Sequence, residues 1–214
     1  KQKVNIVLTF MFNSDLIILD EPTTGLDPIA LIHLKELIQK EKDIGKNKAI
    51  CAKSKLQKHN SEIKIIDYPF ALNETNYQEI VTLYDIIVDG TDSLKSRYLI
   101  NDACILLNKI MVYGALHKFE GQVSVFNYEN GPSYRCLFPN TQSETEVPNC
   151  SEIGVLGVLP GVIGLLQATE VLKIITKKED VLSGKMLCLN LLNHTQFLLR
   201  FSKKQRVFEK VISF

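Results

Sequence analysis

Two acidic residues, Asp20 and Glu21, directly follow an apolar run of four residues, LIIL at 16–19. Such a run predicts a short buried strand, and carboxylates at the carboxyl end of a strand lie where open α/β sheets bind ligands. In nucleotide chemistry the Asp holds Mg²⁺, and the Glu orients or deprotonates the attacking water. The pair therefore predicts a nucleotide-hydrolysing centre, provided that a phosphate-binding loop accompanies it.

Asp92 has a comparable position, in the stretch VDGTDS at the end of the strand predicted at 85–88. Two roles fit this residue: a metal-binding carboxylate at the edge of the sheet, or the N-cap of a helix predicted to start near Leu94. Asp89 starts the same turn, and we expect its role to be structural.

Cys150 is the thiol that best fits a covalent role. It lies between the polar stretch 141–150 and the glycine-rich stretch GVLGVLPGVIG at 154–164. A cysteine on a loop near a helix start can react as the thiolate. The cysteines at 51, 104 and 188 fall in apolar patterns and are expected in the core. Five dispersed cysteines without a CxxC pair indicate a reduced, cytoplasmic chain.

The elements that must position these residues alternate between strand and helix. This order predicts an α/β fold with a doubly wound parallel sheet up to Ala115 and an antiparallel extension after Gly121. A turn at 130–132 is expected to lead into a further extended segment, 134–138, and the stretch 141–150 to form a crossing loop. The expected strands are 16–19, 62–66, 85–88, 110–115, 122–128, 184–192 and 196–201, and the expected helices are 4–12, 28–42, 49–59, 76–83, 94–108 and 157–176.

Composition narrows the class of partner. The 214 residues are 45% hydrophobic and 23% charged, enough for a sizeable core, and the net charge is +1. A charge this small argues against nucleic acid or an anionic membrane as a partner. No apolar run approaches the roughly 20 residues that span a membrane, and nothing near the start reads as a signal peptide.

The first 42 residues resemble part of an ABC-type ATPase. The stretch that carries the resemblance is LIILDEPTTGLDP, at 16–28, which is similar to the Walker B motif and D-loop of that family. The resemblance implies that Asp20 is the metal ligand, Glu21 the general base and Asp27 the D-loop aspartate. However, the chain contains no GxxxxGK[ST] loop, and without a phosphate cradle the pair has little to act on. We expect a structural remnant of a P-loop ATPase.

Residues 44–202 resemble a second family, the ThiF/MoeB/HesA adenylyltransferases, which are relatives of ubiquitin-activating enzymes. Four blocks in the right order carry this resemblance: IGKNK at 44–48, IIVDGTDSLKSRYLIND at 86–102, VYGALHKFEGQVSVFNYENGPSYRCLFP at 112–139 and CSEIGVLGVLPGVIGLLQATEVLKII at 150–175. It implies ATP- and Mg²⁺-dependent adenylation of the C-terminal glycine of a ubiquitin-like sulfur-carrier protein, for molybdopterin or thiamine synthesis, by a homodimer.

The same resemblance assigns individual residues. Asp92 matches the Mg²⁺-binding aspartate, and Lys48 matches a lysine that contacts ATP phosphates. Arg97 and Asn101 match an arginine and an asparagine of the family, for which we expect structural or nucleotide-adjacent roles, and Cys150 matches a cysteine that some members link covalently to the carrier. Many members also bind structural zinc through two CxxC pairs. Here the first pair is reduced to Cys136 and the second is missing from 205–214, so we expect no zinc.

The two resemblances predict a chimera with three parts: an ABC-type fragment at 1–43, an adenylyltransferase domain at 44–202, and a solvated tail at 203–214. The glycine-rich GxGGxG turn of the second family is not in the sequence, so we expect adenylation to be impaired. We also expect strand 16–19 to pair with the exposed edge of strand 85–88. Two alternatives stay open: a truncated ABC transporter ATP-binding subunit, and a non-catalytic module that binds the carrier or a second copy.

Overall fold

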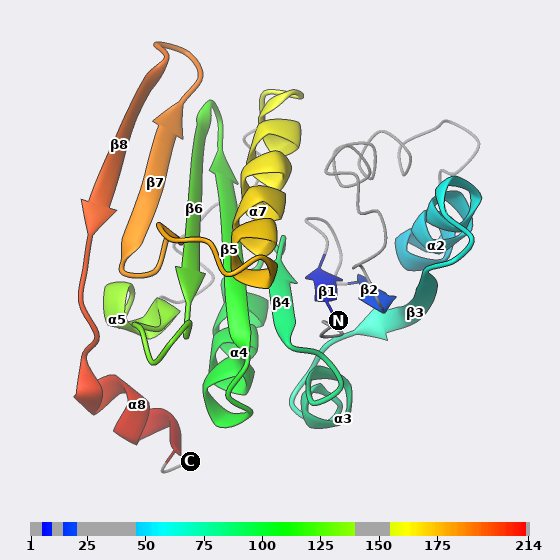
Figure 1. The fold of residues 1–214 in the computed structure, drawn as a ribbon, viewed down its shortest axis with the longest axis horizontal. Coiled ribbons are helices and arrows are strands. Elements are labelled where there is room, and N and C mark those ends of the chain that lie inside the picture. Colours follow the sequence, from blue (N-terminus) through cyan, green and yellow to red (C-terminus); the bar gives the residue numbers. More distant parts are fainter. Residues whose placement is uncertain (1–5, 10–14, 21–45, 140–154, 213–214) are drawn as a thin grey trace.

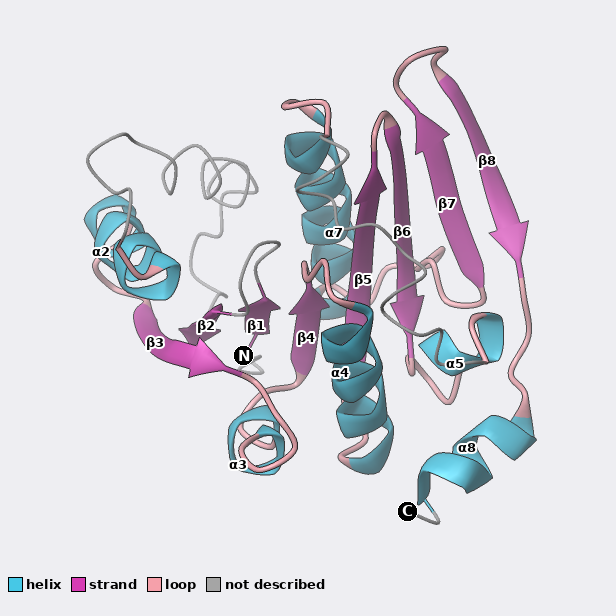
Figure 2. Ribbon diagram, turned by 180° about the vertical axis from the view of Figure 1, so that it is seen from behind, coloured by secondary structure: helices cyan, strands magenta, loops and turns pink. Residues whose placement is uncertain are grey.

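The computed structural model describes residues 6–9, 15–20, 46–139 and 155–212. These residues form one eight-stranded sheet with helices on both faces (Figures 1 and 2). The strands are β1 (Ile6–Thr9), β2 (Asp15–Asp20), β3 (Lys64–Ala71), β4 (Ile86–Asp89), β5 (Ile110–His117), β6 (Glu120–Phe126), β7 (Lys185–Asn190) and β8 (Thr195–Arg200). The helices are α2 (Lys48–His59), α3 (Tyr77–Val81), α4 (Leu94–Leu106), α5 (Tyr134–Leu137), α7 (Leu159–Ile175) and α8 (Gln205–Ile212).

The strands lie in the order β3-β2-β1-β4-β5-β6-β7-β8. Three neighbours, β1, β4 and β5, run parallel, with Ile86 of β4 paired to Ile6 on one side and to Ile110 on the other. From β5 to β8 every pairing is antiparallel. The expected α/β sheet with an antiparallel extension is therefore confirmed from β4 onward, whereas the antiparallel pairings of β2 with β1 and β3 depart from the parallel sheet expected up to Ala115.

Two helical layers cover the sheet. Helices α2 and α7 contribute to one core cluster, and α3, α4 and α5 contribute to another on the opposite face. Figure 1 shows α7 in front of β5 and β6, and Figure 2 shows α4 on the reverse side. At the centre of the second cluster, the rings of Tyr113, Phe126 and Tyr134 lie 5.5–5.7 Å apart between centroids. Such aromatic contacts add stability beyond the area that they bury.

The segment that carries Asp92 folds as its residue types dictate. All four residues of β4 are buried, as expected for a central parallel strand covered on both faces. Helix α4 then begins at Leu94, and its N-cap is Ser93, whose hydroxyl accepts a hydrogen bond from the Ser96 amide (3.3 Å). The cap role considered for Asp92 is therefore wrong, because the neighbouring serine performs it.

The N-terminal expectations need two corrections. The predicted helix 4–12 is wrong in the described part, because Ile6–Thr9 forms β1, which pairs with β4. The strand predicted at 16–19 is confirmed as β2, but it pairs with β1 and β3 and not with β4. An apolar run such as this fits either helix or strand locally, and the open edge of β4 selects the strand.

The reversal of β2 also moves Asp20. Because β2 runs antiparallel to β1, Leu19 is opposite Ile6, and Ile6 is in turn opposite Ile86 at the start of β4. Asp20 therefore lies near the amino end of β4, whereas Asp92 follows its carboxyl end. The expectation that Asp20 lies at the ligand-binding edge of the parallel strands is wrong.

Two C-terminal expectations also change. The segment 134–138, predicted to be extended, contains the short helix α5, which turns Tyr134 and Cys136 into the core. Residues 205–212, predicted to be a solvated tail, form α8, which packs against α4 and buries the side chains of Phe208 and Val211. The remaining helices and strands within the described ranges lie within a few residues of their predicted positions, although β3 extends further, to Ala71.

Candidate functional site

The turn between β4 and α4 is the centre of the candidate site. Asp89 is completely buried, and its Oδ1 accepts hydrogen bonds from the Thr91 amide (2.9 Å) and hydroxyl (2.8 Å). This arrangement is an Asx turn, which fixes the backbone just before Asp92. Asp92 itself is half-buried, and within the described part of the chain no hydrogen bond or ion pair engages its carboxylate. The turn thus presents one carboxylate at the carboxyl edge of β4.

Arg97 reinforces this turn from helix α4. Its Nη2 donates to the Thr91 carbonyl oxygen (2.6 Å), its Nε lies 3.5 Å from Asp89 Oδ2, and its guanidinium stacks 5.1 Å from the centre of the Tyr113 ring. Burial disfavours the charged form of Arg97, but the neighbouring Tyr113 and Asp89 raise its pKa overall. The side chain therefore stays charged and is held by protein groups.

Asn101, one helical turn after Arg97, also makes its contacts within the protein. Its Oδ1 accepts from the Tyr134 amide (2.9 Å), and its Nδ2 donates to Asp102 Oδ1 (2.9 Å). Asn101 is 1% exposed, so these bonds replace the water that the amide loses on burial. The residue joins α4 to the start of α5.

A pocket of about 360 Å³ opens beside this turn, on the face of the sheet that α4 covers. This size is at the lower end of the range of small-ligand sites. Burial raises the pKa of Tyr98, Tyr113 and Tyr134 in its wall, so these phenols remain neutral hydrogen-bonding groups. The pocket is lined by residues of α4, β5, β6 and α5 with the residues after it: Leu94, Arg97, Tyr98, Tyr113, Ala115, Leu116, His117, Glu120, Gln122, Tyr134, Leu137, Phe138 and Pro139.

Both ends of the segment that contains Cys150 are fixed next to this pocket. On one side, Pro139 lines the pocket directly. On the other, Val155 bridges to Lys118, whose carbonyl oxygen accepts from the Leu156 amide (3.0 Å). Lys118 follows the pocket residue His117. Pro139 therefore lies in the pocket wall, and Val155 lies next to a strand that contributes to it.

The other predicted site residues are not brought together with Asp92 by the described contacts. Lys48 is the first residue of α2, which packs on β3, and two strands separate β3 from β4. Glu21, Asp27 and Cys150 lie outside the described residues. The role of Lys48 and the roles of these three residues stay predictions.

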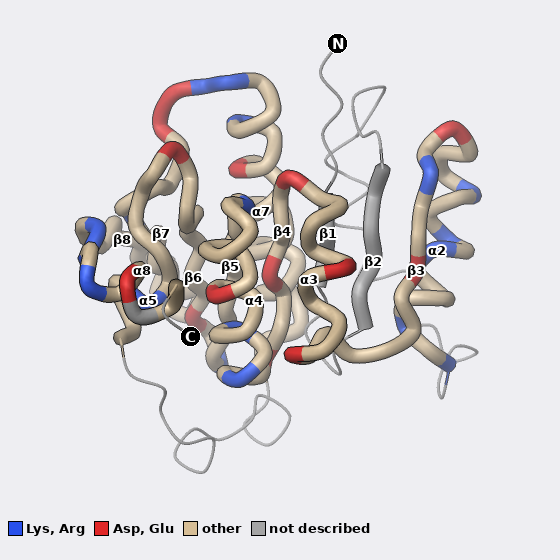
Figure 3. The backbone as a smooth tube through the Cα atoms, turned by 90° about the horizontal axis from the view of Figure 1, so that it is seen from below, with Lys and Arg blue, Asp and Glu red and all other residues tan. Residues whose placement is uncertain are grey.

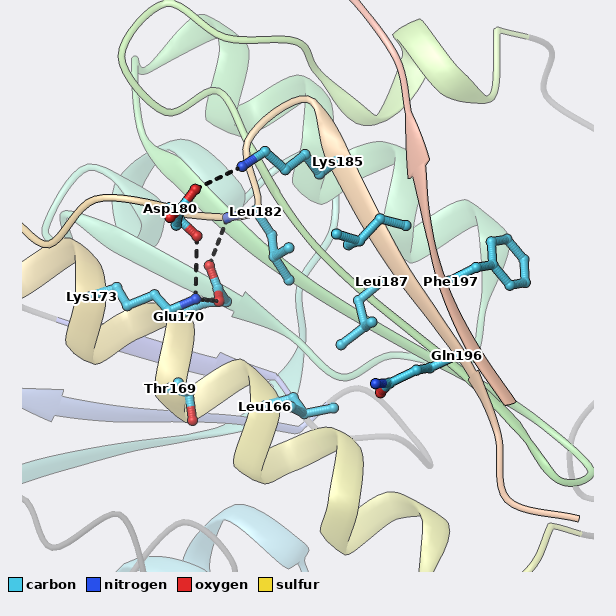
Figure 4. A pocket seen from close by; sticks show the side chains of 11 residues that line it. Leu166, Thr169, Glu170, Lys173, Asp180, Leu182, Lys185, Leu187, Gln196 and Phe197 are labelled. Carbon is cyan, nitrogen blue, oxygen red and sulfur yellow. Dashed lines mark hydrogen bonds and ion pairs between the residues drawn. The ribbon is translucent and has the colours of Figure 1, made fainter. Parts of the chain in front are cut away.

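A second pocket, of about 580 Å³, lies between α7 and the strands β7 and β8 (Figure 4). Its charged groups pair with one another. Lys173 Nζ contacts Glu170 Oε1 (2.6 Å), Glu170 Oε2 accepts from the Leu182 amide (2.8 Å), and Lys185 Nζ contacts Asp180 Oδ1 (3.2 Å). Because its charged side chains pair with one another, this pocket offers fewer groups for binding a ligand than the pocket beside Asp92.

Cys136 does not fit the zinc site of the resembled family. The thiol is buried, accepts a hydrogen bond from the Lys204 amide (3.3 Å) and lies 3.5 Å from the Ser133 hydroxyl, which replaces one expected ligand. Among the described residues there is no group of three or more His, Cys, Asp or Glu side chains placed to hold a metal. Zinc needs four such ligands at a structural site. By contrast, Mg²⁺ is commonly held by one carboxylate together with substrate phosphates. The carboxylate of Asp92 fits this kind of site.

Cys51 also departs from its expectation. It lies half-exposed on α2, whereas Cys104 and Cys188 are buried as expected.

Charged residues of both signs are distributed over the described part of the chain (Figure 3). Within the described ranges, none of the helices is both long and apolar enough to cross a membrane.

Sequence reasoning missed one residue near the site, Gln167. It is the polar member of the series Leu159, Ile163, Gln167 and Val171, whose spacing of four places all of them on the buried face of α7. This spacing was a usable signal, since a buried amide needs hydrogen-bond partners. The partners are the carbonyl oxygens of Asp89 (2.7 Å) and Val112 (3.2 Å).

Comparison with known proteins places this chain in a family. Residues 34–207 match the ThiF family. A probable molybdopterin-synthase adenylyltransferase of Porphyra purpurea is 45% identical over 181 residues, which cover 80% of this chain and 47% of that protein. A sulfur carrier protein adenylyltransferase of Thermus thermophilus is 42% identical over 158 residues, covering 72% of this chain and 58% of that protein. The chain thus spans about half the length of these curated relatives.

Solved structures agree at the level of the fold. Escherichia coli MccB superposes with a TM-score of 0.63 at 18% identity, over 80% of this chain and 52% of MccB. At this identity the likeness shows the α/β fold alone.

Proposed function

The chain belongs to the ThiF family, and from this premise we propose that its site serves the adenylation of the C-terminal glycine of a ubiquitin-like sulfur-carrier protein. In this reaction a carboxylate oxygen of the glycine attacks the α-phosphorus of ATP. The bond from that phosphorus to the β-phosphate bridging oxygen breaks, pyrophosphate leaves, and the carrier ends as an acyl-adenylate. The carrier would belong to molybdopterin or thiamine synthesis, and positioning and charge neutralisation supply most of such catalysis.

The observation that carries the proposal is the placement of Asp92. Its carboxylate lies at the carboxyl edge of β4 and follows a turn held by Asp89 and Arg97. Ser93 caps helix α4, so the carboxylate of Asp92 is not used for that purpose. Asp92 would hold Mg²⁺, which supplies neutralisation of the ATP phosphates. The rigid turn keeps the carboxylate in place before ATP arrives.

The pocket beside Asp92 suits the carrier's C-terminal tail. Leu94, two residues after Asp92, lines its wall, so a chain end lying in the pocket would reach the metal-binding turn. The small side chain of Ala115 and the neutral phenols of Tyr98 and Tyr113 leave room for an extended glycine-rich segment. We assign the pocket to that segment and call it the tail pocket.

Cys150 is proposed to react with the activated carrier. Pro139, the last described residue before it, lines the tail pocket, and Val155, the first described residue after it, pairs with Lys118, the neighbour of the pocket residue His117. A thiolate there would attack the acyl-adenylate carbonyl, forming a thioester and releasing AMP. Lys48, Arg97 and Asn101 are proposed to act near the nucleotide, with Arg97 and Asn101 acting through the protein groups that they bind.

We infer that turnover is reduced in this chain. In dinucleotide-binding folds, a glycine-rich turn and a helix N-terminus after the first strand hold the phosphates. Here β1 neighbours β4, but only the five residues 10–14 separate it from the antiparallel β2. A crossover helix between parallel strands needs a dozen residues or more. The ATP phosphates therefore lose an amide cradle at this position.

ATP–pyrophosphate exchange in the presence of a glycine-terminated carrier tests the proposed function. We expect slow, carrier-dependent exchange that Asp92→Asn reduces at least about tenfold, as for loss of a charge-stabilising group. Glu74→Gln, an exposed carboxylate 3.7 Å from Lys95, is the matched control and should change nothing. Carrier binding without exchange would support a non-catalytic binding module, and neither binding nor exchange would contradict the proposal.

The motif at 16–28 favours a second candidate for residues 1–43: descent from an ABC transporter ATP-binding subunit, joined to the adenylyltransferase domain at 44–202. Asp20, Glu21 and Asp27 would be its remnants. Amplification across codons 35–55 of the gene tests the join, because an uninterrupted product supports a fused gene and its failure supports a false assembly. The family resemblance also favours a homodimer, which light scattering would test.

A further inference from the structure

Gln167 is one of two polar residues among the buried positions of α7; the other, Glu170, pairs with Lys173 and with the Leu182 amide. Leu159, Ile163 and Val171, at intervals of four residues on α7, are all buried against the sheet. Gln167 shares that face and is 7% exposed. A buried amide is costly unless it is hydrogen-bonded, so its retention among apolar neighbours points to a specific use.

The contacts of Gln167 join two strands at the edge where the site lies. Nε2 donates to the carbonyl oxygen of Asp89, the last residue of β4, over 2.7 Å. The same nitrogen donates to the carbonyl oxygen of Val112 on β5 over 3.2 Å. One amide thus ties β4 to β5 from the face that α7 covers.

The backbone of β5 makes room for this contact. A methyl group placed on Gly114 would lie 2.5 Å from Gln167 Cδ and 2.7 Å from its Nε2 and Oε1. These distances are shorter than any tolerated contact, so an alanine at 114 would displace the amide. Gly114 and Gln167 are therefore complementary in size, and either residue alone can be changed to disturb the contact.

The turn after β4 is consequently held from both faces of the sheet. From the α4 face, Arg97 binds the Thr91 carbonyl oxygen, and the Asp89 carboxylate binds the Thr91 amide and hydroxyl. From the α7 face, Gln167 binds the Asp89 carbonyl oxygen. Asp92 follows directly, so its position depends on both sets of contacts.

We propose that Gln167 is a positioning residue for Asp92, acting through the Asp89 carbonyl oxygen and the Asp89–Thr91 turn. The inference rests on the proposed function, in which Asp92 binds the metal that accompanies ATP. Loss of the amide removes this bond to the Asp89 carbonyl oxygen and loosens the turn, while α7 remains packed through its apolar residues. The affinity for the metal should therefore fall while the stability of the fold changes little.

Two measurements on the full chain test this assignment. The first is the dissociation constant of Mn²⁺ in the presence of ATP, followed by electron paramagnetic resonance. The second is hydrogen exchange of the Thr91 amide, which is bonded to Asp89 Oδ1. Gln167→Met removes the donor at similar volume, Gly114→Ala displaces it, and Thr169→Val is the control, because Thr169 on the same helix bonds only the Leu165 carbonyl oxygen (2.9 Å).

We expect Gln167→Met and Gly114→Ala to raise the Mn²⁺ dissociation constant about tenfold, the lower end of supporting-residue effects, and to speed Thr91 exchange. Thr169→Val should leave both values at wild type. If the Gln167→Met variant does not fold, the two measurements on Gly114→Ala test the inference alone. Unchanged Thr91 exchange in the folded variants would overturn the inference. Faster exchange together with no Mn²⁺ binding by the wild-type chain would support the positioning contact and contradict the proposed function instead.

Discussion

Arg135 on α5 and Asp102 on α4 form a two-point pair, in which Nε and Nη2 of the arginine donate to the two carboxylate oxygens over 2.7 Å each. The guanidinium also lies 4.5 Å from the centre of the Tyr98 ring. The Asp102 partner raises the pKa of Arg135. The short helix α5, which forms one wall of the tail pocket, is thus fixed to α4 by a charged clamp.

Asp102→Asn should destabilise the fold by about 1–2 kcal/mol, because it removes one charge-assisted bond of the pair and weakens the other. The two side chains are 20% and 27% exposed, so solvent screens them only partly. Urea denaturation at neutral pH measures the change. Lys95→Met serves as control, because the Lys95–Glu74 pair is about 70% exposed and should contribute nothing measurable. Equal effects of both substitutions would contradict the clamp.

A second pair predicts a pH dependence of stability. Lys53 Nζ on α2 lies 2.6 Å from Asp67 Oδ1 on β3, and this hydrogen bond lowers the pKa of Asp67. A carboxylate whose pKa is lowered by folding stabilises the protein above its unfolded-state pKa, about 3.9, and loses that contribution as the pH falls through the folded value. Asp67→Asn should therefore cost about 0.5 kcal/mol at pH 7 and progressively less below pH 4. Urea titrations of both proteins at several pH values check this, and a difference that grows on acidification would refute it.

Thiol labelling should separate the cysteines by environment. Burial raises the pKa of Cys104 and of Cys188, so both should resist iodoacetamide in the folded protein. Cys51 is half-exposed and should react slowly, at the rate of an ordinary thiol. Under the proposed function Cys150 reacts faster than Cys51. Mass spectrometry of timed samples gives each rate, and Cys150→Ser identifies the fast site. If Cys104 reacted as quickly as Cys51, the packing around α4 described above would be wrong.

Filling the tail pocket should impair carrier binding selectively. Ala115→Leu adds volume at a lining position of the 360 Å³ pocket and should weaken binding of a glycine-terminated carrier at least about tenfold, the cost of one badly placed side chain at an interface. Mn²⁺–ATP binding should stay unchanged, since Asp92 is untouched. Calorimetry with the carrier measures the first value. The matched control is Leu187→Phe in the second pocket, which should leave carrier binding at wild type.

The central part of the fold was predictable because local patterns and tertiary contacts agree there. The strand predicted at 85–88 contains the apolar run Ile86–Val88 and is followed by turn residues, and the buried β4 (Ile86–Asp89) overlaps it. The run at 4–12 fits either a helix or a strand locally, and the conformation of its described part, Ile6–Thr9, depends on the edge of β4, some 80 residues away in sequence. The aromatic residues at 134–138 favour a strand locally, but the ring of Tyr134 fits the core from a helix.

For the site, the sequence was sufficient to find Asp92 but not the contacts that hold it. Its spacing after an apolar run places it at an edge of the sheet. The cap role, in contrast, was given to the wrong residue, because Asp and Ser are equivalent candidates until the helix start is known. The bond from Gln167 to the Asp89 carbonyl oxygen links residues 78 positions apart and depends on the missing side chain at Gly114. No local pattern encodes such a match.

Under the proposed function, the direct return from β1 to β2 affects turnover more than carrier binding. The wall of the tail pocket is built from α4, β5, β6 and α5, and neither β5 nor β6 pairs with β1 or β2. The ATP phosphates, by contrast, would lie near β1, which pairs with β4. Under the proposed function, this chain can therefore retain a carrier that it activates slowly. In a cell that also contains a fully active relative, it would act as a competitor that lowers the supply of free carrier.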